Sequence, residues 1–239
     1  MKPNLYSNTA LTAQLQAGVR LSYPRWMVDV AARSVPGAAD DRASMQTAIG
    51  LATRNVQENT GGPFGAVITK DLVDPAGEFL QRIVLGMGVN RVVPASDSTA
   101  HGETTAIRLA QARFGRFHLA DLGGNPGLVT LFTSGEPCAQ CIGNIAWAGV
   151  GRVVFASTSG DIEEITGFDE GPRHPEWVTE MEVRGMVIEG PFMREEGRLA
   201  LVAYSESGAV VYNAGAVIQD PQEALLEQSL AEFLSRGRG

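Results

Sequence analysis

The sequence predicts a three-layer α/β domain with terminal additions. Hydrophobic residues make up 44% of its 239 residues and charged residues 19%, so the chain can bury a substantial core. Strand-like and helix-like segments alternate at β-α-β crossover lengths over residues 128–157, which indicates parallel strands with helices packed on the sheet. There is no internal repeat or low-complexity linker. We therefore expect a single domain over 1–239, with a core at about 43–215, an N-terminal extension at 1–42 and a C-terminal helical extension at 216–239.

The first half of the core combines one helix with two strands. Apolar residues recur at helical spacing over 42–59, and Asp40 or Asp41 can cap the start of this helix. Two runs of buried-strand composition follow, joined by a hairpin-like segment, at 64–69 and 81–90.

The second half continues the alternation, with helix-forming segments and short apolar runs of strand type. In chain order the expected elements are helix 101–115, strand 128–134, helix 138–149, strand 151–157, strand 181–190, helix 192–208 and an amphipathic helix at 221–237. Residues 1–40 have room for short helices. Together these segments predict a five-stranded mixed sheet flanked by helices.

Composition excludes several classes of partner. The formal net charge of −8 argues against nucleic acid, because affinity for nucleic acid comes mainly from neutralised phosphates. No apolar run approaches the roughly 18 residues of a membrane span, and the N-terminal segment lacks a signal-peptide core. Two cysteines cannot form a disulfide framework for a chain of this size. We expect a cytoplasmic protein with no nucleic-acid partner and no membrane association.

The two cysteines, Cys138 and Cys141, form a C-x-x-C pair at the start of a predicted helix. One interpretation is a thioredoxin-like redox pair, whose thiol pKa is lowered by the helix N-terminus. A second is half of a structural zinc site, although a second C-x-x-C or H-x-H partner is missing nearby. A third is a metal site that is completed by a ligand elsewhere in the chain.

His101, two residues before Glu103 at another helix start, favours the third interpretation. His101, Cys138 and Cys141 offer the nitrogen and sulfur ligands that zinc prefers, and three ligands leave a fourth position open, as in catalytic sites. Cys138 and Cys141 lie on one helix face, so both can reach one metal. The order H-x-E followed by P-C-x-x-C is the signature of zinc deaminases, in which the glutamate, here Glu103, is a general acid and base.

Further blocks of sequence resemble a known family. The segments "GGPFGAVIT", "GVNRVV", "TAHGETTAIRLA", "LFTSGEPCAQCIGNIAWAGVGRVVFAS" and "ITGFDEGP" occur in the order seen in guanine deaminases of the cytidine deaminase-like fold, over about residues 43–215. "NRVVP", "GFDEGPR" and "VYNA" are similar to the bacterial branch, some members of which accept the triazine ammeline. The resemblance implies an α/β/α cytidine deaminase-like fold, one zinc ion per subunit and a homodimer.

The resemblance also implies roles for residues outside the zinc motifs. Asn90 would hydrogen-bond the purine, which suits an amide that offers both a donor and an acceptor. Phe64 would pack near the base. Glu170, or less favourably Asp169, would be a second catalytic carboxylate that accepts from the N1–H and 2-amino groups of guanine. Trp147 and the late segment "VVYNAG" would close this pocket or the pocket of a neighbouring subunit.

Two glycines depart from the pattern of the family. Gly102 stands where relatives usually have Ala, which would add room beside the metal and loosen the backbone whose N–H is expected to bond the base. Gly135 stands where relatives often have Ala or Cys. Both departures bear on which ring the pocket admits.

The expected reaction is hydrolytic deamination of guanine to xanthine and ammonia, with water as co-substrate. Glu103 would move protons, and Glu170 and Asn90 would orient the ring. The alternatives within the class are a deaminase of ammeline, a pterin, cytosine or a nucleoside, and a tRNA adenosine deaminase, which should carry a basic surface. A non-catalytic zinc-binding module is the alternative outside the class, and the presence of Glu103 argues against it.

Overall fold

The computed structural model describes residues 23–33, 40–120, 122, 128–213, 230 and 235. The chain divides into two compact units, and the elements discussed below belong to the unit Tyr23–Ala214. The C-terminal helix predicted at 221–237 lies outside the described residues, apart from two positions. The division into one domain with two extensions therefore stays a prediction.

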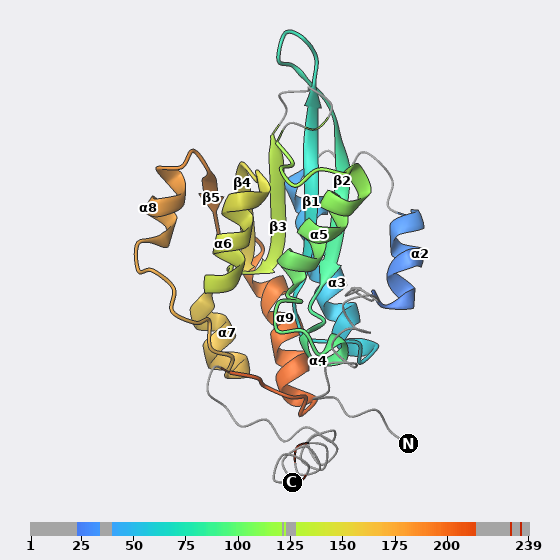
Figure 1. The fold of residues 1–239 in the computed structure, drawn as a ribbon, viewed down its shortest axis with the longest axis vertical. Coiled ribbons are helices and arrows are strands. Elements are labelled where there is room, and N and C mark those ends of the chain that lie inside the picture. The colour runs from blue at the N-terminus through green and yellow to red at the C-terminus, as the bar shows by residue number, and fades with distance from the viewer. Residues whose placement is uncertain are drawn as a thin grey trace. The chain divides into compact units, whose positions relative to one another are not determined.

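Five strands form one mixed sheet in the order β2-β1-β3-β4-β5 (Figure 1). The central strand β1 (Gly65–Val73) pairs antiparallel with β2 (Phe79–Val89) on one side and with β3 (Val129–Gly135) on the other. The strands β3, β4 (Arg152–Ser157) and β5 (Val187–Glu189) are mutually parallel. The predicted five-stranded mixed sheet is confirmed.

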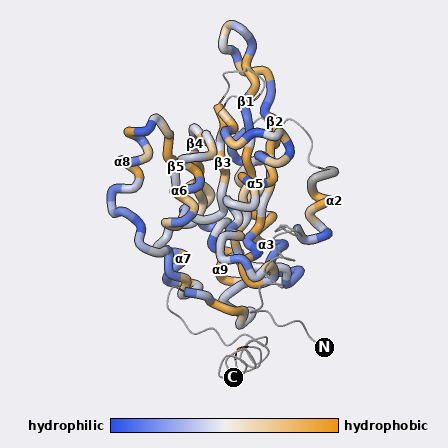
Figure 2. The backbone as a smooth tube through the Cα atoms, viewed as in Figure 1, coloured by the Kyte–Doolittle hydropathy of each residue, from blue (hydrophilic) through white to orange (hydrophobic). Residues whose placement is uncertain are grey.

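Helices cover both faces of the sheet, because successive strand residues point to opposite sides. On one face α5 (Gly102–Phe114), α6 (Ala139–Ala148) and α8 (Trp177–Glu182) pack against a buried cluster that includes Ile68 and Leu131. Figure 2 shows apolar residues along β1 and β2, which contribute Ala66, Ile68 and Leu85 to this cluster.

The opposite face of the sheet carries a second set of helices. These are α3 (Asp41–Gln57), α2 (Arg25–Arg33) and α9 (Arg194–Glu206). The helices α3 and α2 pack with the neighbouring strand residues Val67 and Phe132, which point away from the first cluster, and α9 packs against α3 and β4. The two clusters make the three layers that the sequence predicts.

Local signals explain where the predicted helices begin and end. Asp40 caps α3, because its Oδ1 accepts a hydrogen bond from the Ala43 N–H at 2.6 Å. Gly115 ends α5 in the left-handed conformation that glycine adopts without strain. Three short helices were not predicted: α4 (Val92–Ala95), α7 (Ser159–Thr166), which begins with a capping box, and α8.

The strand predicted at 181–190 is wrong over much of its length. Only Val187–Glu189 is a strand, because Met181 lies in the last turn of α8, where it and Trp177 are one helical turn apart and are both buried. The hairpin connection is also shorter than expected. The strand β1 continues to Val73, and β2 already begins at Phe79, so both strands are longer than predicted.

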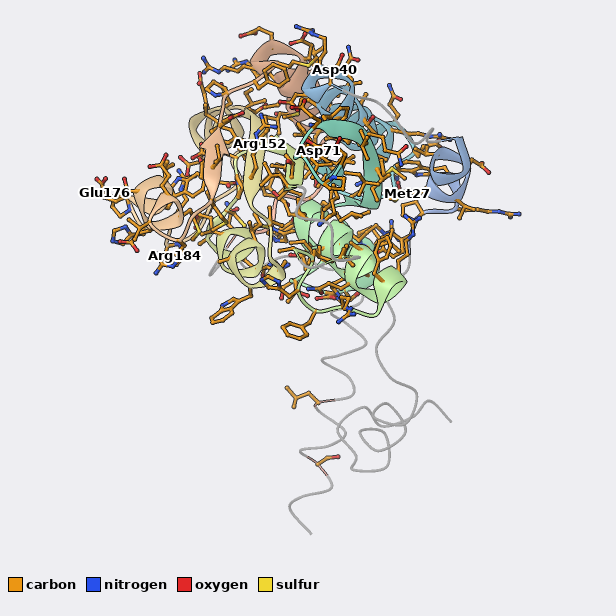
Figure 3. All side chains as sticks on the ribbon, turned by 90° about the horizontal axis from the view of Figure 1, so that it is seen from above. Met27, Asp40, Asp71, Arg152, Glu176 and Arg184 are labelled. Carbon is orange, nitrogen blue, oxygen red and sulfur yellow. The ribbon has the colours of Figure 1, made fainter. Side chains whose placement is uncertain are left out.

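An ion-pair network ties α3 to the sheet. Arg82 on β2 donates to Asp71 on β1 at 2.6 Å and to Asp41 at the start of α3 at 2.8 Å. Arg152 on β4 donates to Asp41 at 2.6 Å and also pairs with Glu189 on β5. Figure 3 labels Arg152 and Asp71 in this part of the molecule.

Within the part of the chain that the structure describes, no helix has the length and apolar character needed to span a bilayer.

Candidate zinc and substrate site

Two helix N-termini define the site. His101 is the N-cap of α5, and Cys138 is the N-cap of α6, which begins after β3. Both residues have extended backbone angles, so the chain turns into the helix at the point where each side chain leaves it. Helix N-termini carry partial positive charge, which favours thiolates and carboxylates at this end of the sheet.

The three predicted ligands lie together in the geometry that zinc requires. The His101 Nδ1 atom lies 3.4 Å from the Cys138 Sγ atom and 3.6 Å from the Cys141 Sγ atom. All three ligand atoms lie within 4.8 Å of one another. Tetrahedral zinc, with bonds of about 2.3 Å to sulfur and about 2.0–2.1 Å to nitrogen, separates these atoms by about 3.6 Å. The donor set and its spacing therefore fit zinc, with one position left for water or substrate.

The two thiols share their charge unequally. The hydrogen bond from Cys141, together with His101, holds the pKa of Cys138 well below its usual range. The same hydrogen bond and burial raise the pKa of Cys141. One thiolate thus forms readily beside the imidazole, and a metal cation would stabilise the second.

Glu103 lies beside these ligands on the first turn of α5 and is buried. The Thr133 hydroxyl donates to its Oε1 atom at 3.0 Å, and the Cys141 thiol donates to its Oε2 atom at 3.4 Å. Burial, reinforced by the neighbouring Cys138 charge, raises the pKa of Glu103 above its ordinary value. A buried carboxyl group beside the metal ligands is placed to accept a proton from a bound water and pass it on.

A pocket opens directly over the ligands. Its residues come from the ends of β-strands, from helix starts and from two later loops, and they are Phe64, His101, Glu103, Glu136, Cys138, Phe168, Asp169, Glu170 and Tyr212. Phe168 contacts both other aromatic walls, with ring centroids 5.7 Å from Phe64 and 4.9 Å from Tyr212. Aromatic walls around a few polar groups suit a flat heterocyclic ring.

Glu170 is the buried one of the two acidic candidates in this pocket. Burial raises the pKa of Glu170 to about 9, and its carbonyl accepts from the Ala139 N–H on α6 at 3.1 Å. Asp169 is exposed, and its Oδ1 atom accepts from the Gly171 N–H. The geometry therefore favours Glu170 as the second carboxylate.

Asn90 is buried just outside the residues that line the pocket. Its Nδ2 atom donates to the Tyr212 hydroxyl at 2.6 Å, and its Oδ1 atom accepts from the Val92 N–H at 3.2 Å. The Asn55 Nδ2 atom donates to the Asn90 backbone carbonyl oxygen at 2.9 Å, which fixes the backbone of Asn90. Tyr212, from the predicted segment 210–215, therefore connects Asn90 to the pocket wall.

Other predicted positions are not in the pocket. The indole of Trp147 is 84% exposed on α6, so it does not close the pocket of its own chain. A methyl group on Gly102 would lie 3.2 Å from the Phe64 carbonyl oxygen, so the room it leaves faces backbone and not the cavity. A methyl group on Gly135 would meet the Ile162 side chain at 2.9 Å and the Phe64 ring at 3.4 Å, and so acts on a pocket wall.

Sequence reasoning missed Glu136, which joins several parts of the site. Its Oε1 atom accepts from Arg173 at 2.6 Å and from the Trp177 indole at 3.2 Å, while Oε2 accepts from the Ser159 N–H at 2.8 Å. Phe168, Thr133 and Tyr212 were also missed as individual residues. The position of Glu136 directly before Pro137 and Cys138 was a usable signal, whereas the contacts of Thr133 and Tyr212 join residues far apart in sequence.

Comparisons with known proteins agree with this site. Residues 38–157 match the model of the cytidine and deoxycytidylate deaminase zinc-binding region. The guanine deaminase of Bacillus subtilis is 38% identical over 126 residues, which cover 53% of this chain and 69% of that protein. A probable cytosine deaminase of Schizosaccharomyces pombe is 25% identical over 173 residues, covering 70% of this chain and 94% of that protein.

Solved structures are also similar. The structure of the guanine deaminase from Nitrosomonas europaea is 32% identical with a TM-score of 0.66, and covers 80% of this chain and 97% of its own. The NE0047 protein in complex with 2,6-diaminopurine is 33% identical with a TM-score of 0.70, covering 84% of this chain and all of that one. The predicted fold, the resemblance and the zinc cofactor are confirmed. The chain belongs to the family defined by the cytidine and deoxycytidylate deaminase zinc-binding region, whose zinc ligands here would be His101, Cys138 and Cys141.

Proposed function

We propose that this chain is a zinc-dependent guanine deaminase, which converts guanine and water to xanthine and ammonia. The observation that carries the proposal is the pairing of two buried carboxyl groups, Glu103 and Glu170, in one aromatic-walled pocket over the zinc ligands. Relatives described as guanine deaminases support the choice of base.

The reaction needs an activated water and a group that moves protons. Zinc held by His101, Cys138 and Cys141 would supply the Lewis acidity that makes water a nucleophile at neutral pH. Glu103 takes a proton from the attacking water and delivers it toward the amino nitrogen. A carbon–oxygen bond forms at the carbon bearing the amino group, the carbon–nitrogen bond breaks, and ammonia leaves.

Glu170 gives the pocket its preference for an amino-heterocycle with adjacent donors. Guanine presents its N1–H and 2-amino groups side by side. Burial raises the pKa of Glu170 to about 9 in the empty pocket, and these two donors favour its ionised form, which can accept from both. Phe64 and Phe168 lie on the aromatic walls against which a flat ring packs. Asn90 would reach the ring only if its hydrogen bond to Tyr212 is exchanged for one to the base.

An ammonia-release panel tests the proposal. We expect guanine to have the highest kcat/KM among guanine, ammeline, cytosine, adenine and their nucleosides. The Glu103→Gln variant should bind zinc normally and lose turnover, because an amide cannot take the proton of water. Zinc-loaded wild-type protein that deaminates another base and leaves guanine intact would move the assignment to a related substrate.

The assembly and location of the protein are also part of the proposal. The resemblance supports a homodimer, the two-cysteine content fits a reducing, cytoplasmic compartment, and the net charge of −8 argues against nucleic-acid partners. Light scattering on the purified chain measures the first directly. A deaminase of tRNA adenosine would instead show tRNA binding that weakens steeply with salt.

A further inference from the structure

We propose that Thr133 is a positioning residue for the catalytic carboxyl group of Glu103. Its hydroxyl holds the Oε1 atom of Glu103, so that the Oε2 atom is the one turned toward the zinc ligands. The inference rests on the proposed function, because it assigns which oxygen of Glu103 exchanges the proton. The hydrogen bond measures 3.0 Å, and both residues are buried.

The sheet fixes Thr133 on both sides. In the register of β3 it lies opposite Ala66 of β1 on one side and Phe155 of β4 on the other. Threonine is also stiff at its first side-chain torsion because it is branched at Cβ. Its hydroxyl therefore approaches α5 from a rigid support, which a loop residue would not provide.

The two oxygens of Glu103 have different surroundings. The Oε1 atom accepts from Thr133, whereas the Oε2 atom lies 3.4 Å from the Cys141 sulfur. When Cys141 binds zinc as a thiolate it has no proton to donate, so this second hydrogen bond disappears. The Thr133 bond does not involve a zinc ligand and persists, which leaves Oε2 facing the ligands and available for proton exchange.

A second threonine of the same strand provides a matched control. Thr130 is as deeply buried as Thr133 but points to the opposite face of the sheet. Its hydroxyl has no hydrogen-bond partner within the part of the chain that the structure describes. Replacing either threonine with Val removes one hydroxyl from β3 at nearly constant volume, and only Thr133 supports Glu103.

The test compares Thr133→Val, Thr133→Ser and Thr130→Val as zinc-loaded proteins, on the best base of the ammonia-release panel. We expect Thr133→Val to lower kcat about tenfold or more, as for the loss of one hydrogen bond to a charged group. Its KM and zinc content should stay within twofold of the wild type. Thr133→Ser should restore most of kcat, and Thr130→Val should match the wild type.

A second readout needs neither zinc nor substrate. In the metal-free protein, Thr133→Val strips a buried carboxyl oxygen of its donor, so the melting temperature should fall by about 2–4 °C or more. Thr130→Val removes an unpaired hydroxyl and should not lower it. Thr133→Val with unchanged kcat would overturn the inference, whatever its melting temperature. A loss of kcat that Ser does not restore would do the same. Failure of the wild type on guanine alone would instead count against the proposed substrate.

Discussion

Arg173 holds the loop that carries Glu170 against the segment that leads to the proposed zinc ligands Cys138 and Cys141. Its guanidinium donates to Glu136 at 2.6 Å and lies over the Trp177 ring, 5.7 Å from the centroid. The Arg173 and Glu136 side chains are only 22% and 12% exposed. We predict that Arg173→Met, which keeps the apolar stem and removes the charge and the donor, loosens this loop.

The cost follows from the contacts that are lost. A hydrogen bond to a charged group contributes about 1.5–3 kcal/mol, and a partly exposed cation–π contact about 0.5–1 kcal/mol. Glu136 keeps two other donors, from Trp177 and Ser159, so its carboxylate is not left without partners. Because Arg173 is partly exposed, solvent screening further reduces the stabilisation that these contacts contribute. We expect the free energy of unfolding to fall by about 1–2 kcal/mol, or roughly 2–8 °C in melting temperature.

Urea unfolding and steady-state kinetics of zinc-loaded protein measure the two effects. Because Glu170 is expected to bind the base, KM for guanine should rise more than kcat falls, with kcat/KM lower by about tenfold. Arg184→Met is the matched control, since Arg184 pairs with Glu180 at 2.8 Å but both side chains are at least half exposed. Figure 3 shows Arg184, in the turn after α8, at the edge of the molecule. Equal stability and equal KM in the two variants would refute the role of Arg173 in holding the Glu170 loop.

Three further predictions concern the second carboxylate, a pocket wall and the ion pair of a buried carboxylate with a half-exposed arginine. Glu170→Gln should lower kcat/KM for guanine by about 10–100-fold with normal zinc content, because an amide offers only one acceptor oxygen to the two donors of guanine. Kinetics with metal analysis checks this, and near-normal rates would remove Glu170 from the site. Gly135→Ala should cost about 1 kcal/mol of stability, since its methyl group meets the end of the Ile162 side chain at 2.9 Å, and should raise KM through its contact with the Phe64 ring; urea unfolding and kinetics check this, and a silent variant contradicts it. Arg194 donates two hydrogen bonds to Asp161 and holds the pKa of that carboxyl well below its usual range. Asp161 thus stabilises the protein above its unfolded pKa of about 4, and this is lost as pH falls through the lower folded pKa. Asp161→Asn should cost about 2 kcal/mol at pH 7 and less at pH 3 by urea unfolding, and a constant difference would count against the ion pair.

The parts of the fold that depend on local patterns could be predicted. The cap at Asp40, the glycine at the end of α5 and the β-α-β alternation around α6 all have signals within a few residues of the element they define. The end of α8 was assigned to a strand. Val183, Val187 and Ile188 favour β-structure, whereas the burial of Met181 in the core selects a helix at this point.

The site divides in the same way. The proposed zinc ligands and Glu103 lie in two short motifs, and the ligand types together with the known signature of zinc deaminases predicted that these motifs converge. The bonds from Thr133 to Glu103 and from Asn90 to Tyr212 join residues 30 and 122 positions apart, and nothing local marks either pair. The sequence could not show that the space left by the absent side chain of Gly102 faces the backbone of Phe64, because only the folded chain places these two residues next to each other.

The placement of the zinc ligands at the starts of two separate helices also links metal supply to folding. His101 and Cys138 are 37 positions apart, so an unfolded chain offers zinc only the cysteine pair at any one place. Binding then favours the folded state by mass action, and each tenfold rise in free zinc above its dissociation constant adds about 1.4 kcal/mol to the unfolding free energy. The cellular level of free zinc would therefore govern the lifetime of this protein as well as its activity.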